Sequence, residues 1–197
     1  MKRIGLIFAL ACGWALGVPQ QANTPTLSEV DQLLLALSDI TWFNNIRPLN
    51  LTKSQIERLI PLHERAYKQL ERLVQEEAKE LRNRKEEILK IREEVSRGKS
   101  LPKQFQETIK RLETDAAQKR RQLRAQVVSE VATELKPHFT EEQMNYMVKR
   151  SKEVLESARV DTSSLKDDQL YALFVESVFL DPRAPELLKE WRSKNLE

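Results

Sequence analysis

The chain has 197 residues, of which 32% are charged, 6% are aromatic and only four are glycine. This composition is typical of long solvated helices with narrow apolar seams, and it argues against a thick globular core. The formal charge of +3, from 33 basic and 30 acidic residues, is smaller than that of a typical nucleic-acid-binding domain.

Residues 1–17 have the pattern of an export signal. A short basic stretch precedes an apolar run from Ile4 to Leu16, and Gly17 completes a small-x-small cleavage pattern. The run is shorter than the roughly 20 apolar residues that a membrane-spanning helix needs, so we expect no stable membrane span. We predict that the mature chain is exported and begins with a polar linker over residues 18–25.

Cys12 is the only cysteine, and it leaves a lipid-anchored form as an alternative, because lipid-attachment signals also place a cysteine after small residues. We favour soluble release, since cleavage after Gly17 keeps the apolar run within the usual length. Loss of Lys2 and Arg3 lowers the 33 basic residues to 31 against 30 acidic ones, a formal charge of +1. Cleavage therefore removes the only thiol and most of the net charge, which argues against redox chemistry and against a nucleic-acid partner.

Sequence patterns of common catalytic sites are absent. The chain has no glycine-rich phosphate loop, no G-x-S-x-G elbow, and only two histidines, His63 and His138. These histidines are too few and too far apart for a zinc or catalytic cluster, so we expect His63 to make a hydrogen bond in a helix seam. We predict a protein that is not an enzyme and has no cofactor and no metal site.

The first predicted helix runs from residue 26 to about Trp42. Thr26 is its expected N-cap, with Glu29 three residues later. We expect the carboxyl-terminal part of the chain to pack against residues 33–42. The apolar face predicted for this helix comprises Leu27, Val30, Leu33, Leu34 and Leu37.

Two capping boxes stand out among the helix starts. In each, a threonine hydroxyl and a glutamine amide three residues later satisfy backbone N–H groups that have no partner at a helix start. The apolar residue before each threonine packs on the fourth helical residue as a hydrophobic staple. The six box residues are Leu51, Thr52 and Gln55, and, 88 residues later, Phe139, Thr140 and Gln143.

Two long helices are predicted between the boxes, over residues 53–97 and 103–136. Gly98 and Pro102 punctuate the break between them, and Pro137 ends the second helix. The first helix repeats apolar residues every seven positions, and the second row of this heptad seam is polar in its middle. We therefore predict an all-α fold built on an elongated antiparallel hairpin.

Shorter helices are predicted after the second box, over residues 141–156 and 165–179, with Ser164 and Asp167 as a weak cap of the latter. Asp181-Pro182 is expected to open a last helix. We assign residues 26–197 to a single helical domain. This domain consists of a hairpin core at 45–158 and a carboxyl-terminal extension at 161–197.

A cluster of basic residues on the two long helices has two interpretations. In the first, Arg84, Lys119, Arg120 and Arg124 form a basic face that attracts acidic or flexible binding partners. The alternative is a solvated face on which these residues pair with neighbouring glutamates, and we favour it because surface charge runs rarely need a partner.

The Leu-Thr-x-x-Gln and Phe-Thr-x-x-Gln boxes, in a chain with an export signal, resemble the LTxxQ-motif family of periplasmic chaperones, the Spy/CpxP type. The first box matches the family spelling completely. The second has Phe139 in place of leucine, which is a partial match. The resemblance covers roughly residues 45–155 and leaves the two ends of the chain without a counterpart.

The resemblance implies a small α-helical homodimer in the periplasm that binds unfolded or damaged envelope proteins without ATP. It leaves two other classes open, an envelope-stress or metal-responsive signalling regulator and a structural coiled-coil protein. On the residues alone, both boxes are explained as helix punctuation.

Overall fold

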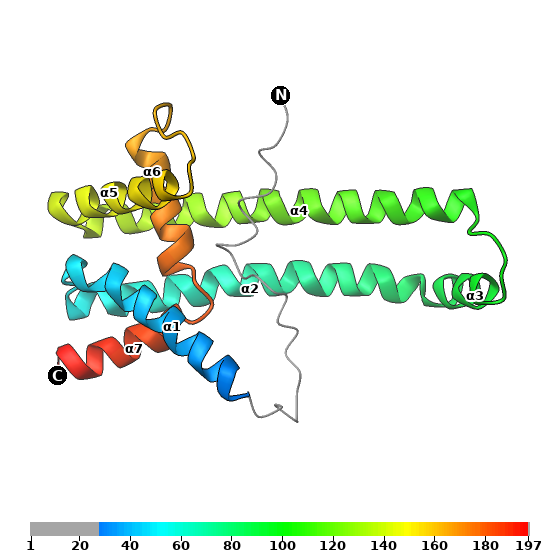
Figure 1. The fold of residues 1–197 in the computed structure, drawn as a ribbon, viewed down its shortest axis with the longest axis horizontal. Coiled ribbons are helices and arrows are strands. Elements are labelled where there is room, and N and C mark those ends of the chain that lie inside the picture. Colours follow the sequence, from blue (N-terminus) through cyan, green and yellow to red (C-terminus); the bar gives the residue numbers. More distant parts are fainter. Residues whose placement is uncertain (1–27, 197) are drawn as a thin grey trace. The chain divides into compact units, whose positions relative to one another are not determined.

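The computed structural model describes residues 28–196, which form helices and connecting turns without a strand in that range (Figure 1). This confirms the predicted all-α class. The signal, linker and Thr26 predictions fall on residues outside the described part. The elements are α1 (Glu29–Ile46), η1 (Arg47–Leu49), α2 (Lys53–Asn83), α3 (Lys85–Ser96), α4 (Lys103–Leu135), η2 (Lys136–His138), α5 (Glu141–Ser157), α6 (Asp167–Phe174), η3 (Val175–Phe179) and α7 (Ala184–Asn195).

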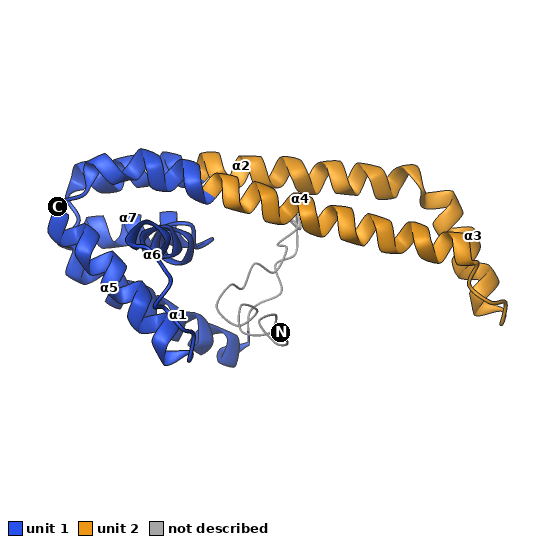
Figure 2. Ribbon diagram, turned by 90° about the horizontal axis from the view of Figure 1, so that it is seen from above, with its two compact units in different colours: residues 1–63, 128–197 blue, residues 64–127 orange. Residues whose placement is uncertain are grey.

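The chain divides into two compact units, which Figure 2 shows in blue and orange. Unit 1 comprises residues 1–63 and 128–197, and unit 2 comprises residues 64–127. Both α2 and α4 contribute to each unit. The assignment of residues 26–197 to one domain stays a prediction.

Unit 1 contains most of the buried core. Its largest fully buried side chains come from the end of α1, from η1 and the connection after it, from the start of α2, the end of α4, and from α5, α6, η3 and α7. The unit thus includes the predicted carboxyl-terminal extension as part of its core. These side chains are Ile46, Leu49, Leu51, Ile56, Leu135, Met147, Phe174, Val175, Phe179 and Leu188.

The amino-terminal helix differs from its prediction in its cap and in its packing. The N-cap is Ser28, whose hydroxyl accepts the Asp31 N–H at 3.2 Å, while the Asp31 carboxylate accepts the Ser28 N–H at 3.3 Å. Leu33 and Leu37 are about 60% exposed, so the predicted apolar face is not covered by the carboxyl-terminal elements of unit 1. Those elements hold the second half of α1 through Asp39 and Trp42.

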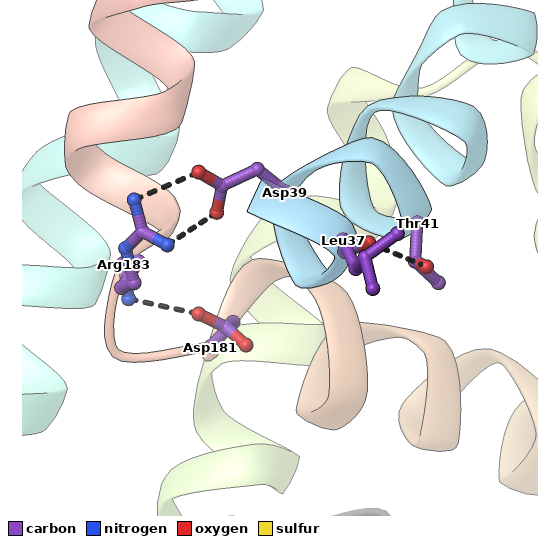
Figure 3. Close-up of polar contacts among 5 residues, drawn as sticks. All are labelled: Leu37, Asp39, Thr41, Asp181 and Arg183. Carbon is purple, nitrogen blue, oxygen red and sulfur yellow. Dashed lines mark hydrogen bonds and ion pairs between the residues drawn. The ribbon is translucent and has the colours of Figure 1, made fainter. Parts of the chain in front are cut away.

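Three side chains hold the second half of α1 in unit 1. Trp42 is buried, and its indole Nε1 donates a hydrogen bond to the Val178 carbonyl at 2.8 Å. Arg183 forms a bidentate ion pair with Asp39, and its Nη2 donates to Asp39 Oδ2 at 2.9 Å (Figure 3). Phe43 stacks on Trp191 of α7 with ring centroids 6.0 Å apart. The end of α1 is therefore a fixed part of unit 1.

The helix predicted over 53–97 is interrupted at Arg84, where α2 ends and α3 begins. The Arg84 N–H bonds to the Leu81 carbonyl, three residues back, instead of four. Asn83 has a poor helix propensity, and Arg82 and Lys85 place like charges on neighbouring positions, so little resists the break. The break is local, because α3 continues to Ser96.

The predicted turn between the long helices is present. α3 ends at Ser96, and Gly98 has a φ of +86°, a left-handed conformation that glycine adopts without a steric cost. The Lys99 N–H bonds to the Glu94 carbonyl at 3.1 Å, which closes the helix end. In unit 2, α2 and α4 then run side by side in opposite directions (Figure 1).

The carboxyl-terminal helices start and end differently from their predictions. α6 is capped at Lys166, whose N–H donates to Gln169 Oε1 at 2.9 Å, and not at Ser164. α6 continues directly into the π-helix η3, which is closed by a hydrogen bond from the Leu180 N–H to the Val175 carbonyl at 2.9 Å. α7 begins at Ala184, because the Asp181 carboxylate accepts the Arg183 N–H and holds the preceding turn.

Tyr171 gives a pH-dependent prediction for unit 1. It is buried, and its hydroxyl donates to the Ala132 carbonyl at 3.2 Å. Burial raises the pKa of this hydroxyl, because the charged form would lose its hydration. The folded state binds the proton more tightly than the unfolded state, so this stabilisation is complete below about pH 10 and is lost as the pH rises further.

We expect Tyr171→Phe to lower the free energy of unfolding by about 1 kcal/mol at neutral pH and to reduce the loss of stability above about pH 10. Urea denaturation across the alkaline range measures both. Tyr146, which is only half-buried, is the matched control, and Tyr146→Phe should keep most of the alkaline loss. An alkaline loss that is unchanged in Tyr171→Phe would contradict the assignment.

Candidate functional site

Both capping boxes have the predicted geometry. The Thr52 N–H donates to Gln55 Oε1 at 2.9 Å, and the Gln55 N–H donates to Thr52 Oγ1 at 3.2 Å. The corresponding distances in the second box, between Thr140 and Gln143, are 3.0 and 3.3 Å. Each box therefore satisfies two backbone donors at the start of its helix.

The apolar residues before the threonines have different surroundings. Leu51 and Ile56 are both buried, as expected of a hydrophobic staple. Phe139 is half-buried and stacks on Phe179 of η3, with ring centroids 5.6 Å apart and planes within 7°. The phenylalanine that departs from the family spelling is thus part of the aromatic packing in unit 1.

The two boxes bind each other, which the sequence reasoning missed. Gln55 Nε2 donates to Gln143 Oε1 at 2.9 Å, and Gln143 Nε2 lies 3.3 Å from Gln55 Oε1. Each amide also crosses to the opposite connection, from Gln55 to the His138 carbonyl and from Gln143 to the Leu49 carbonyl, at 2.7 Å in both cases. The glutamines form one nearly two-fold hydrogen-bond network within unit 1.

The connections before the boxes are also related. A basic residue and a proline open a 3-10 turn before each box, at Arg47-Pro48 in η1 and Lys136-Pro137 in η2. The first connection is longer by Asn50, which has a φ of +47°, a conformation that asparagine tolerates better than most residues. The repeated proline before each box was the sequence signal for this symmetry.

Unit 2 contains a groove between α2 and α4 with a volume of about 340 Å³. Small and apolar side chains alternate with carboxylates along it. In unit 2, among the described residues, only Ala66, Phe105 and Val127 are buried apolar side chains, so the groove residues remain accessible. Its lining comprises Glu77, Glu80, Leu81, Leu112, Glu113, Ala116, Ala117 and Arg120.

One ion pair crosses the groove. Arg120 Nε donates to the Glu77 carboxylate at 2.9 and 3.1 Å, and a second guanidinium nitrogen also bonds to it. The hydrogen bond to Glu77 raises the pKa of Arg120, so the guanidinium stays charged over the whole physiological range. With Glu80 and Glu113 also present, the groove carries more negative than positive charge.

The four residues of the predicted basic face have separate environments. Arg120 pairs with Glu77, and Arg84 lies 3.8 Å from Glu87 at the helix break. Lys119 is exposed and Arg124 is half-buried. The pairing of two arginines with glutamates agrees with the favoured interpretation of a solvated, paired face.

The histidines make no metal cluster. His63 is buried in α2, and its Nε2 lies 2.8 Å from the Asp181 carbonyl, so Nε2 carries the donated proton. Across residues 28–196, no group of three or more potential ligands gathers in a position to bind a metal. Within the same range, no helix has the length and apolar character to span a membrane.

No known protein family, curated protein or solved structure matches this chain. The resemblance to the LTxxQ-motif family therefore stays a prediction based on the two boxes.

Proposed function

We propose that this protein is an ATP-independent chaperone of the holdase type, which binds unfolded or damaged protein segments in the periplasm. The observation that carries the proposal is the accessible groove of unit 2, where apolar and charged side chains of α2 and α4 are mixed. The two capping boxes and the export pattern of residues 1–17 support the assignment to the bacterial envelope.

The groove has the properties that weak and unspecific binding of polypeptides requires. Complete burial of one leucine side chain is worth about 1.5–3 kcal/mol, so a half-exposed leucine offers about 1 kcal/mol to a bound segment. Leu81, Leu112 and the two alanines can together contribute a few kcal/mol to the binding free energy. The conformational entropy that the bound client segment loses offsets part of this gain. We expect dissociation constants in the micromolar range or weaker, which permit release without ATP.

Charge on the groove selects the class of segment. Arg120, the only basic residue that lines the groove, is paired with Glu77, so the charges of Glu80 and Glu113 have no basic counterpart in the lining. A segment that combines apolar residues with lysine or arginine complements this surface, and an acidic segment does not. The preferred client is therefore apolar and basic, in contrast to the acidic clients expected from the predicted basic face.

Suppression of aggregation tests the function directly. Purified protein in excess over a chemically denatured client should lower the light scattering of that client without nucleotide. Unchanged scattering at every ratio and salt concentration would exclude the holdase function and favour a structural coiled-coil role.

Substitution of Leu81 tests the groove. Leu81 is 54% exposed and lines the groove, whereas Leu89 of α3 is 51% exposed and lies outside it. We expect Leu81→Asp to weaken binding of a fluorescent apolar and basic peptide at least fivefold, because the new carboxylate is hydrated next to the apolar floor. Leu89→Asp, the matched control, should change the affinity less than twofold.

Fluorescence anisotropy measures these affinities, with an apolar peptide carrying glutamates as a second probe. Equal effects of Leu81→Asp and Leu89→Asp would place client binding elsewhere. Equal affinities for the basic and the acidic peptide would contradict the charge preference.

A further inference from the structure

The first half of α1 carries an apolar surface that no described element of unit 1 covers. Among the described residues, twelve large apolar side chains are exposed, and six of them lie within residues 30–40. Figure 1 shows this end of α1 extending beyond the part that packs in unit 1. We name as the α1 surface the residues Val30, Leu33, Leu34, Leu35, Leu37 and Ile40.

The spacing of the α1 surface is that of a helix-pairing seam. Val30, Leu33, Leu37 and Ile40 follow each other at intervals of three, four and three, and each is 57–64% exposed. This spacing places them on one stripe of the helix, in the positions that face a partner in a coiled coil. The spacing is also palindromic, so a second copy that runs in the opposite direction presents the same pattern.

The charges around the seam favour a second copy over a membrane. Between residues 30 and 41 the only charged side chains are Asp31 and Asp39, and Asp39 is paired with Arg183. α1 has no lysine or arginine, although helices that bind anionic lipid surfaces carry such residues on their polar face. A parallel pair would bring Glu29 and Asp31 of both copies together, whereas an antiparallel pair brings Asp31 level with Asp39, whose charge Arg183 balances.

The surface is presented on a fixed support. Trp42 and Ile46 are buried, and Figure 3 shows Arg183 paired with Asp39, which lies between Leu37 and Thr41 on α1. The Thr41 hydroxyl bonds to the Leu37 carbonyl at 3.0 Å within the same helix. Because α1 is already helical and anchored in each copy, pairing loses little conformational entropy of the backbone, a loss that weakens most associations.

We propose that α1 pairs antiparallel with α1 of a second copy of this chain, as a two-fold contact in which Leu33 of each copy lies against Leu37 of the other. The six side chains offer on the order of 500 Å² of apolar surface, which is comparable with the largest patch of a typical monomer, about 300–600 Å² and often functional, and less than the ~800 Å² per partner of a standard interface. The dimer is therefore in exchange with the monomer, with a dissociation constant in the micromolar range. This inference is independent of the client groove.

Sedimentation velocity of the full chain over a range from about 1 to several hundred micromolar tests the proposal. Wild type should pass from monomer to dimer in this range. Leu33→Glu combined with Leu37→Glu should weaken dimerisation at least 100-fold, because four carboxylates would face each other across the seam. Leu89→Glu combined with Leu101→Glu, at two exposed leucines of unit 2, should change it less than twofold.

Both double variants alter exposed side chains, so circular dichroism and thermal unfolding should match wild type and separate loss of pairing from loss of folding. Cross-linking tests the direction. In a Cys12→Ser background, a mixture of Leu33→Cys and Leu37→Cys chains should form mixed disulfide dimers faster than either chain alone.

Three results would overturn the proposal: a wild type that stays monomeric, α1 variants that dimerise like wild type, or an α1 surface that binds phosphatidylcholine or phosphatidylglycerol vesicles instead of another copy. Peptide binding that remains sensitive to Leu81→Asp in a monomeric α1 variant would show that the client groove works without this contact.

Discussion

Replacement of Gln143 by alanine should lower the free energy of unfolding by about 3 kcal/mol. Gln143 is buried, and its amide bonds to Gln55, to the Leu49 carbonyl and to the Thr140 N–H at the same time. Truncation would leave these groups without a partner in a place where water has little access, and a buried polar group without a partner costs about 1–3 kcal/mol. Urea denaturation followed by circular dichroism gives the change.

Gln169 provides the matched control for Gln143. It occupies the same position in the cap of α6, but it is exposed and its Oε1 accepts only the Lys166 N–H. Gln169→Ala should cost less than about 1 kcal/mol, as expected for loss of a solvated cap. A double-mutant cycle of Gln55→Ala and Gln143→Ala should give a coupling free energy above about 1 kcal/mol, and additive effects would contradict direct pairing of the boxes.

Truncation of Trp42 to alanine should lower the free energy of unfolding by about 3–5 kcal/mol. The indole is buried where α1 meets η3, and it donates the hydrogen bond to the Val178 carbonyl. Trp42→Phe should cost less, about 1–2 kcal/mol, because it keeps most of the apolar contact and loses the donor. Thermal and urea unfolding measure both variants.

Hydrogen exchange should show where the Trp42 variants lose stability. We expect the amides of α1 to exchange faster in Trp42→Ala, because the anchor of this helix in unit 1 is gone. Trp191, which is half-buried and stacks on Phe43, is the control, and Trp191→Ala should cost less than Trp42→Ala. Equal losses for the two tryptophans would contradict the role of Trp42 as the main anchor.

Local chemistry made several elements predictable. The two threonine boxes, Gly98 and Pro137 act within one turn of the chain, and each has the structure that its residues predict. The all-α class follows from composition and from the spacing of apolar residues, which also depend on no distant contact. The cap of α1 was misplaced because Thr26 and Ser28 offer similar side chains two residues apart.

The candidate site was less accessible to sequence reasoning. The predicted basic face was drawn from charges on each helix, but the structure pairs Arg120 with Glu77 and lines the groove with further carboxylates. Which charges meet across two helices depends on their register and rotation, and the heptad pattern of one helix does not define either. The net negative charge of the groove therefore emerged only from the fold.

The sequence by itself determined the starts of α2 and α5, the turn at Gly98 and the end of α4 before Pro137, because caps, glycine and proline act on the backbone within a few residues. Tertiary structure alone decided that Gln55 and Gln143 bind each other across 88 residues and that Trp42 meets a π-helix. It also decided that Leu33 and Leu37 face outward. An apolar pattern in the sequence indicates that a helix face favours burial. Only the folded structure shows whether that face is buried within the same chain.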